Sequence, residues 1–133
     1  ERTAEEIKIE FGNVYPSKED LIKKEVRGRD KTGLPKTITI TAGEIREAMM
    51  EPMAAILDAI HQALEATPPE LAGDLMINGI NVAGGGALLR GLANLLHDET
   101  GLPIHIAPEP LAAVALGTGK YLNEIKRSLR KVG

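Results

Sequence analysis

A chain of 133 residues with 43% hydrophobic and 26% charged side chains has the length and composition of about one globular domain. Its net charge of −3, two tyrosines, one phenylalanine and no tryptophan exclude the basic, aromatic surface typical of nucleic-acid binding. Because it has no cysteine, disulfides, thiolate metal sites and thiol nucleophiles are excluded as well.

The first forty residues predict a helix followed by a β-hairpin. The sequence opens in a helical pattern at Glu1 without an initiator Met, so we expect a piece of a longer protein. Thr3 and Glu6 have the spacing of a capping box, which predicts a helix that ends near residue 12. Residues 14–24 are polar and charged, as in a surface excursion. Residues 25–40 alternate around a Gly/Pro turn and predict the hairpin.

Residues 41–75 predict helices. Thr41 and Glu44 form a second capping box, and Pro52 is expected to kink or divide the helix that follows. Thr67 is expected to cap the next helix. Between these signals lies an apolar stripe at helical spacing that predicts one buried face: Met53, Ile56, Leu57, Ile60 and Leu64.

Two compact strand–helix units follow. Residues 79–86 are predicted to be a short strand and its glycine turn, residues 87–100 a helix, and residues 102–107 the next strand. The last helix is expected to be interrupted at Gly117 and Gly119. Strands that alternate with helices predict an α/β fold with a parallel or mixed sheet.

The glycine turn lies in NVAGGGALLRGL, residues 81–92, and raises the question of a phosphate loop. A Walker loop requires Lys and Ser/Thr where this chain has Leu92 and Ala93. The dinucleotide fingerprint lacks its third glycine, because Leu89 stands there. Two interpretations stay open: a backbone that approaches a flat ligand closely, and a tight strand–helix turn without a ligand.

Four segments in order along the chain carry a resemblance to a known family: TAEEIKIEFGN, EVRGRDKTGLPKTITIT, TPPELAGDLMINGINVAGGGALLRGL and ETGLPIHIAPEPLAAVALGTGKYL. Over nearly its whole length the chain closely resembles the C-terminal part of the MreB family of bacterial actin homologues. The resemblance implies part of the α/β actin-like ATPase (RNase H-like) fold, which Hsp70 chaperones and sugar kinases share. Residues 1–40 would then form subdomain IIB, a helix and a hairpin, and residues 41–133 the C-terminal part of subdomain IIA.

The same resemblance implies an adenosine site. The glycine turn would pack against adenine and ribose, with Leu88 and Arg90 nearby, and an E-x-x-K segment of subdomain IIB would cover the base from the other side. The implied cofactor-binding residues are Glu5, Glu6, Ile7, Lys8, Gly84, Gly85, Gly86 and Ala87. From the residues alone, Glu5 and Lys8 are more simply an exposed helix ion pair worth about 0.3–0.5 kcal/mol.

The parts that hold phosphates in this family have no counterpart in the sequence. Neither D-x-G-T-x-N nor D-I-G-G-G-T occurs, so we expect ATP or ADP with Mg to bind fully only in the complete protein. The family are weak ATPases, and we expect this chain to be inactive alone, without catalytic or metal-binding residues. The three histidines are scattered and lack metal-ligand spacing: His61, His97 and His105.

The implied function is that of a cytoskeletal protein that forms ATP-dependent filaments and maintains bacterial cell shape. Its partners would be further copies of itself in protofilaments, a membrane adaptor such as RodZ and, indirectly, the inner membrane, with no nucleic acid. Its location would be cytoplasmic, with membrane association through the complete protein or its partners. The alternative is a non-enzymatic module that docks such an adaptor. We also expect the isolated piece to dimerise or swap elements through an exposed sheet edge.

Overall fold

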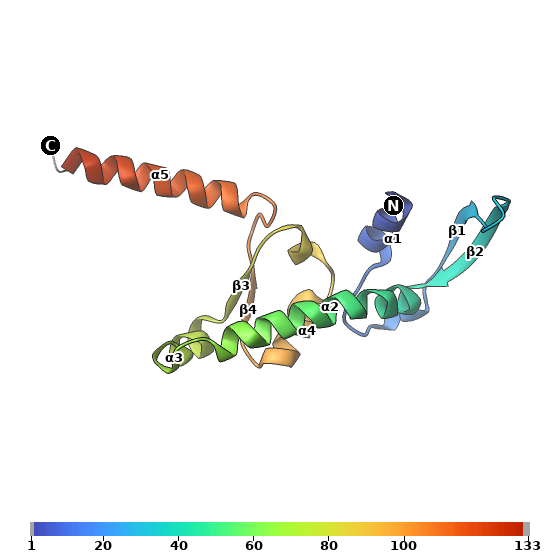
Figure 1. Ribbon diagram of the computed structural model, residues 1–133, viewed down its shortest axis with the longest axis horizontal. Coiled ribbons are helices and arrows are strands. Elements are labelled where there is room, and N and C mark those ends of the chain that lie inside the picture. Colours follow the sequence, from blue (N-terminus) through green and yellow to red (C-terminus); the bar gives the residue numbers. More distant parts are fainter. Residues whose placement is uncertain (1, 132–133) are drawn as a thin grey trace.

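A helix and a β-hairpin form one end of the computed structural model, which describes residues 2–131 and the side chains of residues 2–128 (Figure 1). The elements here are α1 (Arg2–Phe11), the 3-10 turn η1 (Lys18–Leu21), β1 (Lys23–Arg29) and β2 (Pro35–Thr41). β1 and β2 pair antiparallel, which confirms the predicted hairpin. The cap predicted at Thr3 is wrong, because α1 already begins at Arg2 and Thr3 lies inside its first turn.

The long helix α2 (Ala42–Glu65) forms the centre of the molecule (Figure 1). It begins at the predicted capping box: the Glu44 amide donates to the Thr41 hydroxyl at 3.1 Å, and the Glu44 carboxylate accepts from the Thr41 amide at 2.7 Å. Pro52 lies inside α2 without dividing it, so of the two predicted effects, a kink or a division, the division is wrong. A proline costs the helix one hydrogen bond, and the buried Met53 and Leu57 beyond it hold the chain in helical form by tertiary packing.

The chain then turns back through α3 (Pro69–Asn78). Pro68 occupies the N-cap position without a side-chain hydrogen bond, and the Thr67 hydroxyl donates to the Ala63 carbonyl at 2.8 Å. The cap predicted at Thr67 is therefore wrong, because its hydroxyl satisfies the end of α2 rather than the start of α3. α3 also continues beyond its predicted end at Leu75.

Two short parallel strands follow, as the sequence predicted. The remaining elements are β3 (Ile80–Val82), the 3-10 turn η2 (Gly85–Leu88), α4 (Leu92–Thr100), β4 (Ile104–Ile106) and α5 (Ala113–Lys131). β3 pairs parallel with β4, and in the described part of the chain this sheet has two strands.

The last two helices also differ from the prediction. α4 begins at residue 92 rather than 87, because η2 and the left-handed Gly91, with φ of +77°, come first. α5 continues through Gly117 and Gly119 without interruption and extends away from the other elements (Figure 1). An isolated glycine costs a helix about 1 kcal/mol but does not break it.

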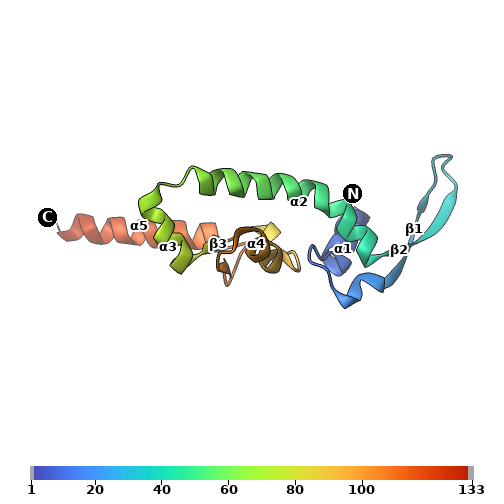
Figure 2. The ribbon, with the colours of Figure 1, turned by 90° about the horizontal axis from the view of Figure 1, so that it is seen from below.

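α2 runs alongside α4 (Figure 2), and an aliphatic cluster between the two helices forms the core. Its buried members are Val14, Met53, Leu57, Leu92, Leu95 and Leu96. Of the predicted stripe on α2, Met53 and Leu57 are buried and Ile60 packs against the cluster, whereas Ile56 is 49% exposed. The stripe therefore buries a narrower face than the sequence suggested.

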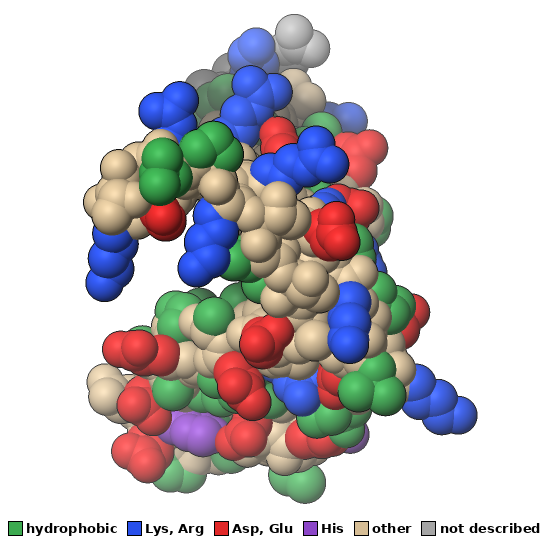
Figure 3. Space-filling model, turned by 90° about the vertical axis from the view of Figure 1, so that its right-hand side faces the viewer, with side chains coloured by type: hydrophobic (Ala, Val, Ile, Leu, Met, Phe, Trp, Pro, Cys, Tyr) green, Lys and Arg blue, Asp and Glu red, His purple; other side chains and the backbone are tan. Residues whose placement is uncertain are grey.

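Charges are distributed unevenly over the surface. On the face shown in Figure 3, most Lys and Arg side chains lie in the upper half and most Asp and Glu side chains in the lower half. The hairpin carries a group of basic residues: Lys23, Lys24, Arg27, Arg29, Lys31 and Lys36. Within residues 2–131, none of the helices combines the length and the apolar character needed to cross a membrane.

An ion pair joins the base of the hairpin to α2. Arg46 on α2 pairs with the Asp20 carboxylate of η1, and the Ser17 amide donates to the same carboxylate at 3.4 Å. The guanidinium of Arg46 beside it is the main reason that the pKa of Asp20 lies below its ordinary value, and burial opposes this effect. The ionised form of Asp20 therefore stabilises the folded state.

We expect Asp20→Asn to lower the stability of the complete protein at pH 7 and to have little effect in acid. The folded pKa of Asp20 lies below the unfolded value of about 3.9, so its contribution is present above that value and is lost as the pH falls through the folded pKa. Urea unfolding from pH 7 downward measures this. A difference between variant and parent that persists unchanged in acid would contradict the electrostatic explanation.

We expect Gly79→Ala to destabilise the complete protein by at least about 2 kcal/mol. Gly79 has a φ of +67°, and an added Cβ would lie 2.0 Å from the Pro103 carbonyl oxygen, which accepts the Ile80 amide at the start of the sheet. Gly101→Ala is the matched control, since its φ of +68° is similar but its Cβ would meet nothing within 4 Å. Equal urea midpoints for the two variants would contradict the steric argument.

Candidate functional site

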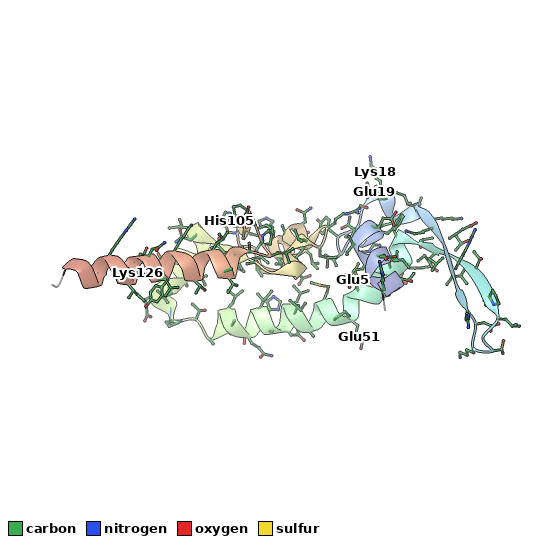
Figure 4. The ribbon with its side chains drawn as sticks, turned by 90° about the horizontal axis from the view of Figure 1, so that it is seen from above. Glu5, Lys18, Glu19, Glu51, His105 and Lys126 are labelled. Carbon is green, nitrogen blue, oxygen red and sulfur yellow. The ribbon has the colours of Figure 1, made fainter. Side chains whose placement is uncertain are left out.

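A cavity of about 550 Å³ lies between α1 and the glycine turn. From α1 it is lined by Glu5, Lys8 and Ile9, and Gly12 directly after the helix lines it as well. From the turn and the loop after β4 it is lined by Gly85, Gly86, Leu88, Leu89, Arg90 and Leu111. Figure 4 shows Glu5 on α1, at the same end of the molecule as the hairpin. The cavity is therefore built mainly from the two segments that the sequence marked, which lie some eighty residues apart in the chain.

The three glycines of the turn differ in what the backbone requires of them. Gly84 has a φ of +87° and donates its amide to the Pro110 carbonyl at 2.8 Å, so its conformation favours glycine. Gly85 and Gly86 lie in the right-handed 3-10 turn, and a Cβ on Gly86 would meet nothing within 4 Å. The backbone thus leaves open space at Gly86 on the wall of the cavity.

The turn is anchored from behind by Ala87. Its side chain is buried, with 6% exposure, and its amide donates to the Gly84 carbonyl at 3.1 Å. Neither Gly84 nor Ala87 lines the cavity. Of the predicted turn residues, Gly85 and Gly86 face the cavity, and the other two hold the turn in shape.

The other wall is one face of α1. Lys8 Nζ lies 3.7 Å from Glu5 Oε1, and both side chains are more than half exposed. The two residues therefore form the exposed ion pair and line the cavity at the same time. Glu6 instead accepts from Arg2 Nε at 3.2 Å, and Ile7 is half-buried without lining the cavity. The structure therefore brings Glu5 and Lys8 to the cavity and leaves Glu6 and Ile7 outside it.

The sequence indicates some of the other residues that line the cavity, but not all of them. Ile9 and Gly12 lie four residues beyond Glu5 and Lys8, so helical spacing alone indicates that they share this face. Leu88 and Arg90 were expected nearby. Leu111 comes from the loop after β4, and its side chain lies 3.4 Å from the position of a Cβ on Gly85. Nothing local in the sequence places it there.

None of the three histidines lines the cavity. His61 Nε2 lies 3.5 Å from the Glu99 carbonyl oxygen, and His97 Nδ1 lies 2.9 Å from that of Leu102. His105 lies on β4, away from Glu5 (Figure 4). Among the residues that the structure describes, no group of three or more His, Asp or Glu side chains has an arrangement that fits a metal ion. The cavity offers one carboxylate, two cations and leucine side chains, which suits a flat ligand with polar edges.

Comparison with known proteins gives a consistent match along the chain. The family model described as MreB/Mbl protein matches residues 1–130. The cell shape-determining protein Mbl of Bacillus cereus is 48% identical over 137 residues, covering 98% of this chain and 40% of that protein. The cell shape-determining protein MreB of Escherichia coli K12 is 48% identical over 126 residues, covering 94% of this chain and 36% of that protein. The chain thus spans 36–40% of the length of these relatives.

Solved structures match over nearly the whole chain as well. The crystal structure of MreB 5 of Spiroplasma citri bound to AMPPNP has a TM-score of 0.88 and 38% identity, and the match covers 99% of this chain and 40% of that one. The structure of the same protein bound to ADP also has a TM-score of 0.88 and 38% identity, and covers 97% of this chain and 39% of that one.

Proposed function

The chain belongs to the MreB/Mbl family, and from this membership we propose that it supplies the adenosine-binding walls of a nucleotide site in a protein that determines cell shape. The observation that carries the proposal is the cavity between α1 and the glycine turn. The AMPPNP and ADP bound to the two similar MreB 5 structures support it. In the complete protein, segments other than this one would hold the phosphates and Mg.

The walls of the cavity have the chemistry that a nucleoside needs. Gly85 and Gly86 let the backbone approach a flat ring closely, and Leu88 supplies an apolar surface. Glu5 accepts hydrogen bonds from ribose hydroxyls, and Lys8 lies along the edge of the base. A volume of about 550 Å³ falls within the range of small-molecule sites.

The subdomain assignment follows from the same proposal. Residues 1–40 form subdomain IIB and residues 41–133 the C-terminal part of subdomain IIA, with the boundary where β2 gives way to α2. ATP hydrolysis, ATP-dependent filaments of further copies, and a cytoplasmic location near the inner membrane belong to the complete protein. Contact with an adaptor such as RodZ stays a prediction.

We expect Gly86→Val in the complete protein to weaken ATP and ADP binding about tenfold, because two new methyl groups would occupy the place of the ring. The open space at Gly86 predicts that thermal stability changes little. Titration with a fluorescent ATP analogue, with inorganic tripolyphosphate as competitor, measures the loss. The affinity for tripolyphosphate should stay at the parent's value, because these walls contact only the adenosine end.

Gly28→Val is the matched control for this experiment. Gly28 lies on β1, far from the cavity lining, and a Cβ there would also meet nothing within 4 Å. It should bind ATP like the parent protein. If Gly86→Val also bound ATP like the parent, or if Glu5→Ala with Lys8→Ala left the affinity unchanged, the adenosine site would be wrong.

A further inference from the structure

The helix that forms one wall of the cavity has few attachments. None of its described side chains is buried. On the hairpin side, Lys24 pairs with Glu10 and lies 4.6 Å from the centre of the Phe11 ring. These contacts join α1 to the hairpin, and α1 also touches α2. Neither set of contacts reaches the glycine turn. The distance of α1 from the glycine turn depends on contacts between the C-terminal end of α1 and the turn itself.

The carbonyls at the end of α1 identify such a contact. A helix leaves its last carbonyls without partners in the helix. The Lys8 carbonyl accepts the Gly12 amide at 2.8 Å. The next two carbonyls, those of Ile9 and Glu10, accept from the same Arg90 Nη2, the first at 3.2 Å. Arg90 therefore satisfies the end of α1 with a positive charge, which the helix dipole favours.

The backbone of Arg90 is fixed as well. Its carbonyl accepts the Val14 amide at 3.0 Å, and Val14 is 1% exposed in the core. Arg90 lies two residues beyond η2, whose residues Gly85, Gly86 and Leu88 line the cavity. One residue thus connects the turn, the core and the end of α1. Because a guanidinium is planar and carries several donors in fixed directions, it holds two carbonyls in a defined place better than an ammonium does.

We propose that Arg90 is a positioning residue: by binding the Ile9 and Glu10 carbonyls, it holds α1 at a set distance from the glycine turn and so fixes the width of the adenosine cavity. This role rests on the nucleotide site proposed above. Glu5 and Lys8 lie on the helix that Arg90 holds, so its effect on a bound nucleotide passes through them. A direct contact of Arg90 with the nucleotide would not depend on those two side chains.

The test is the rate of ADP dissociation from the complete protein. We expect Arg90→Gln to release a fluorescent ADP analogue about tenfold faster, since the charged hydrogen bonds to α1 are lost. Arg90→Lys keeps the charge and loses the planar guanidinium with its fixed donors. Its ADP dissociation rate should therefore fall between those of Arg90→Gln and the parent. If Arg90→Gln fails to fold, the intermediate rate of Arg90→Lys carries the test. Arg2→Gln removes the same charge from an exposed pair at the far end of α1 and should change the rate less than about twofold.

A double substitution separates positioning from direct contact. In a Glu5→Ala, Lys8→Ala background, Arg90→Gln or Arg90→Lys should change the ADP dissociation rate less than about twofold, because the polar groups that Arg90 positions against the nucleotide are gone. The same acceleration in both backgrounds, or none in the parent, would overturn the positioning role. If the Glu5→Ala, Lys8→Ala pair itself left ADP binding unchanged, the adenosine site would fail, whatever Arg90 does.

Discussion

The packing of α2 against α4 around Val14 is the constraint on which the rest of the structure depends. Val14 is 1% exposed and comes from the linker that follows α1, so the cluster that joins the two helices also anchors that linker. The Val14 amide in turn bonds the Arg90 carbonyl, next to the glycine turn. Packing in an almost purely aliphatic core therefore decides where both walls of the cavity begin.

The two walls are held very differently. The turn is built on the buried Ala87 and on the hydrogen bond from Gly84 to the loop after β4. α1 buries none of its described side chains and is held mainly at its C-terminal end. A ligand between the walls would add contacts to the weaker wall, and binding energy would then contribute to the stability of the helix that covers it.

Much of the fold was predictable because its signals are local. The capping box at Thr41, the hairpin and the parallel strands are confirmed. The resemblance implied part of the actin-like ATPase fold, and the match to MreB 5 confirms it. The errors lie where tertiary packing or a competing acceptor decided the outcome, as at Pro52 and Thr67. In the site, helical spacing groups Glu5 with Lys8, whereas the approach of Leu111 and the bonds from Arg90 to α1 depend on long-range folding.

Glycine at position 86 leaves space on the cavity wall and lowers the stability of the folded chain. Its backbone is right-handed and nothing lies near its missing side chain, so alanine fits there without strain. Glycine gives the unfolded chain more freedom than alanine does, and such a substitution at a compatible position stabilises a protein by about 0.4–1 kcal/mol. The chain is therefore less stable with glycine at this position than with alanine, although the backbone conformation does not require glycine. Gly86 is therefore a place to look for a trade-off between stability and activity, in which a more stable alanine variant has a narrower site.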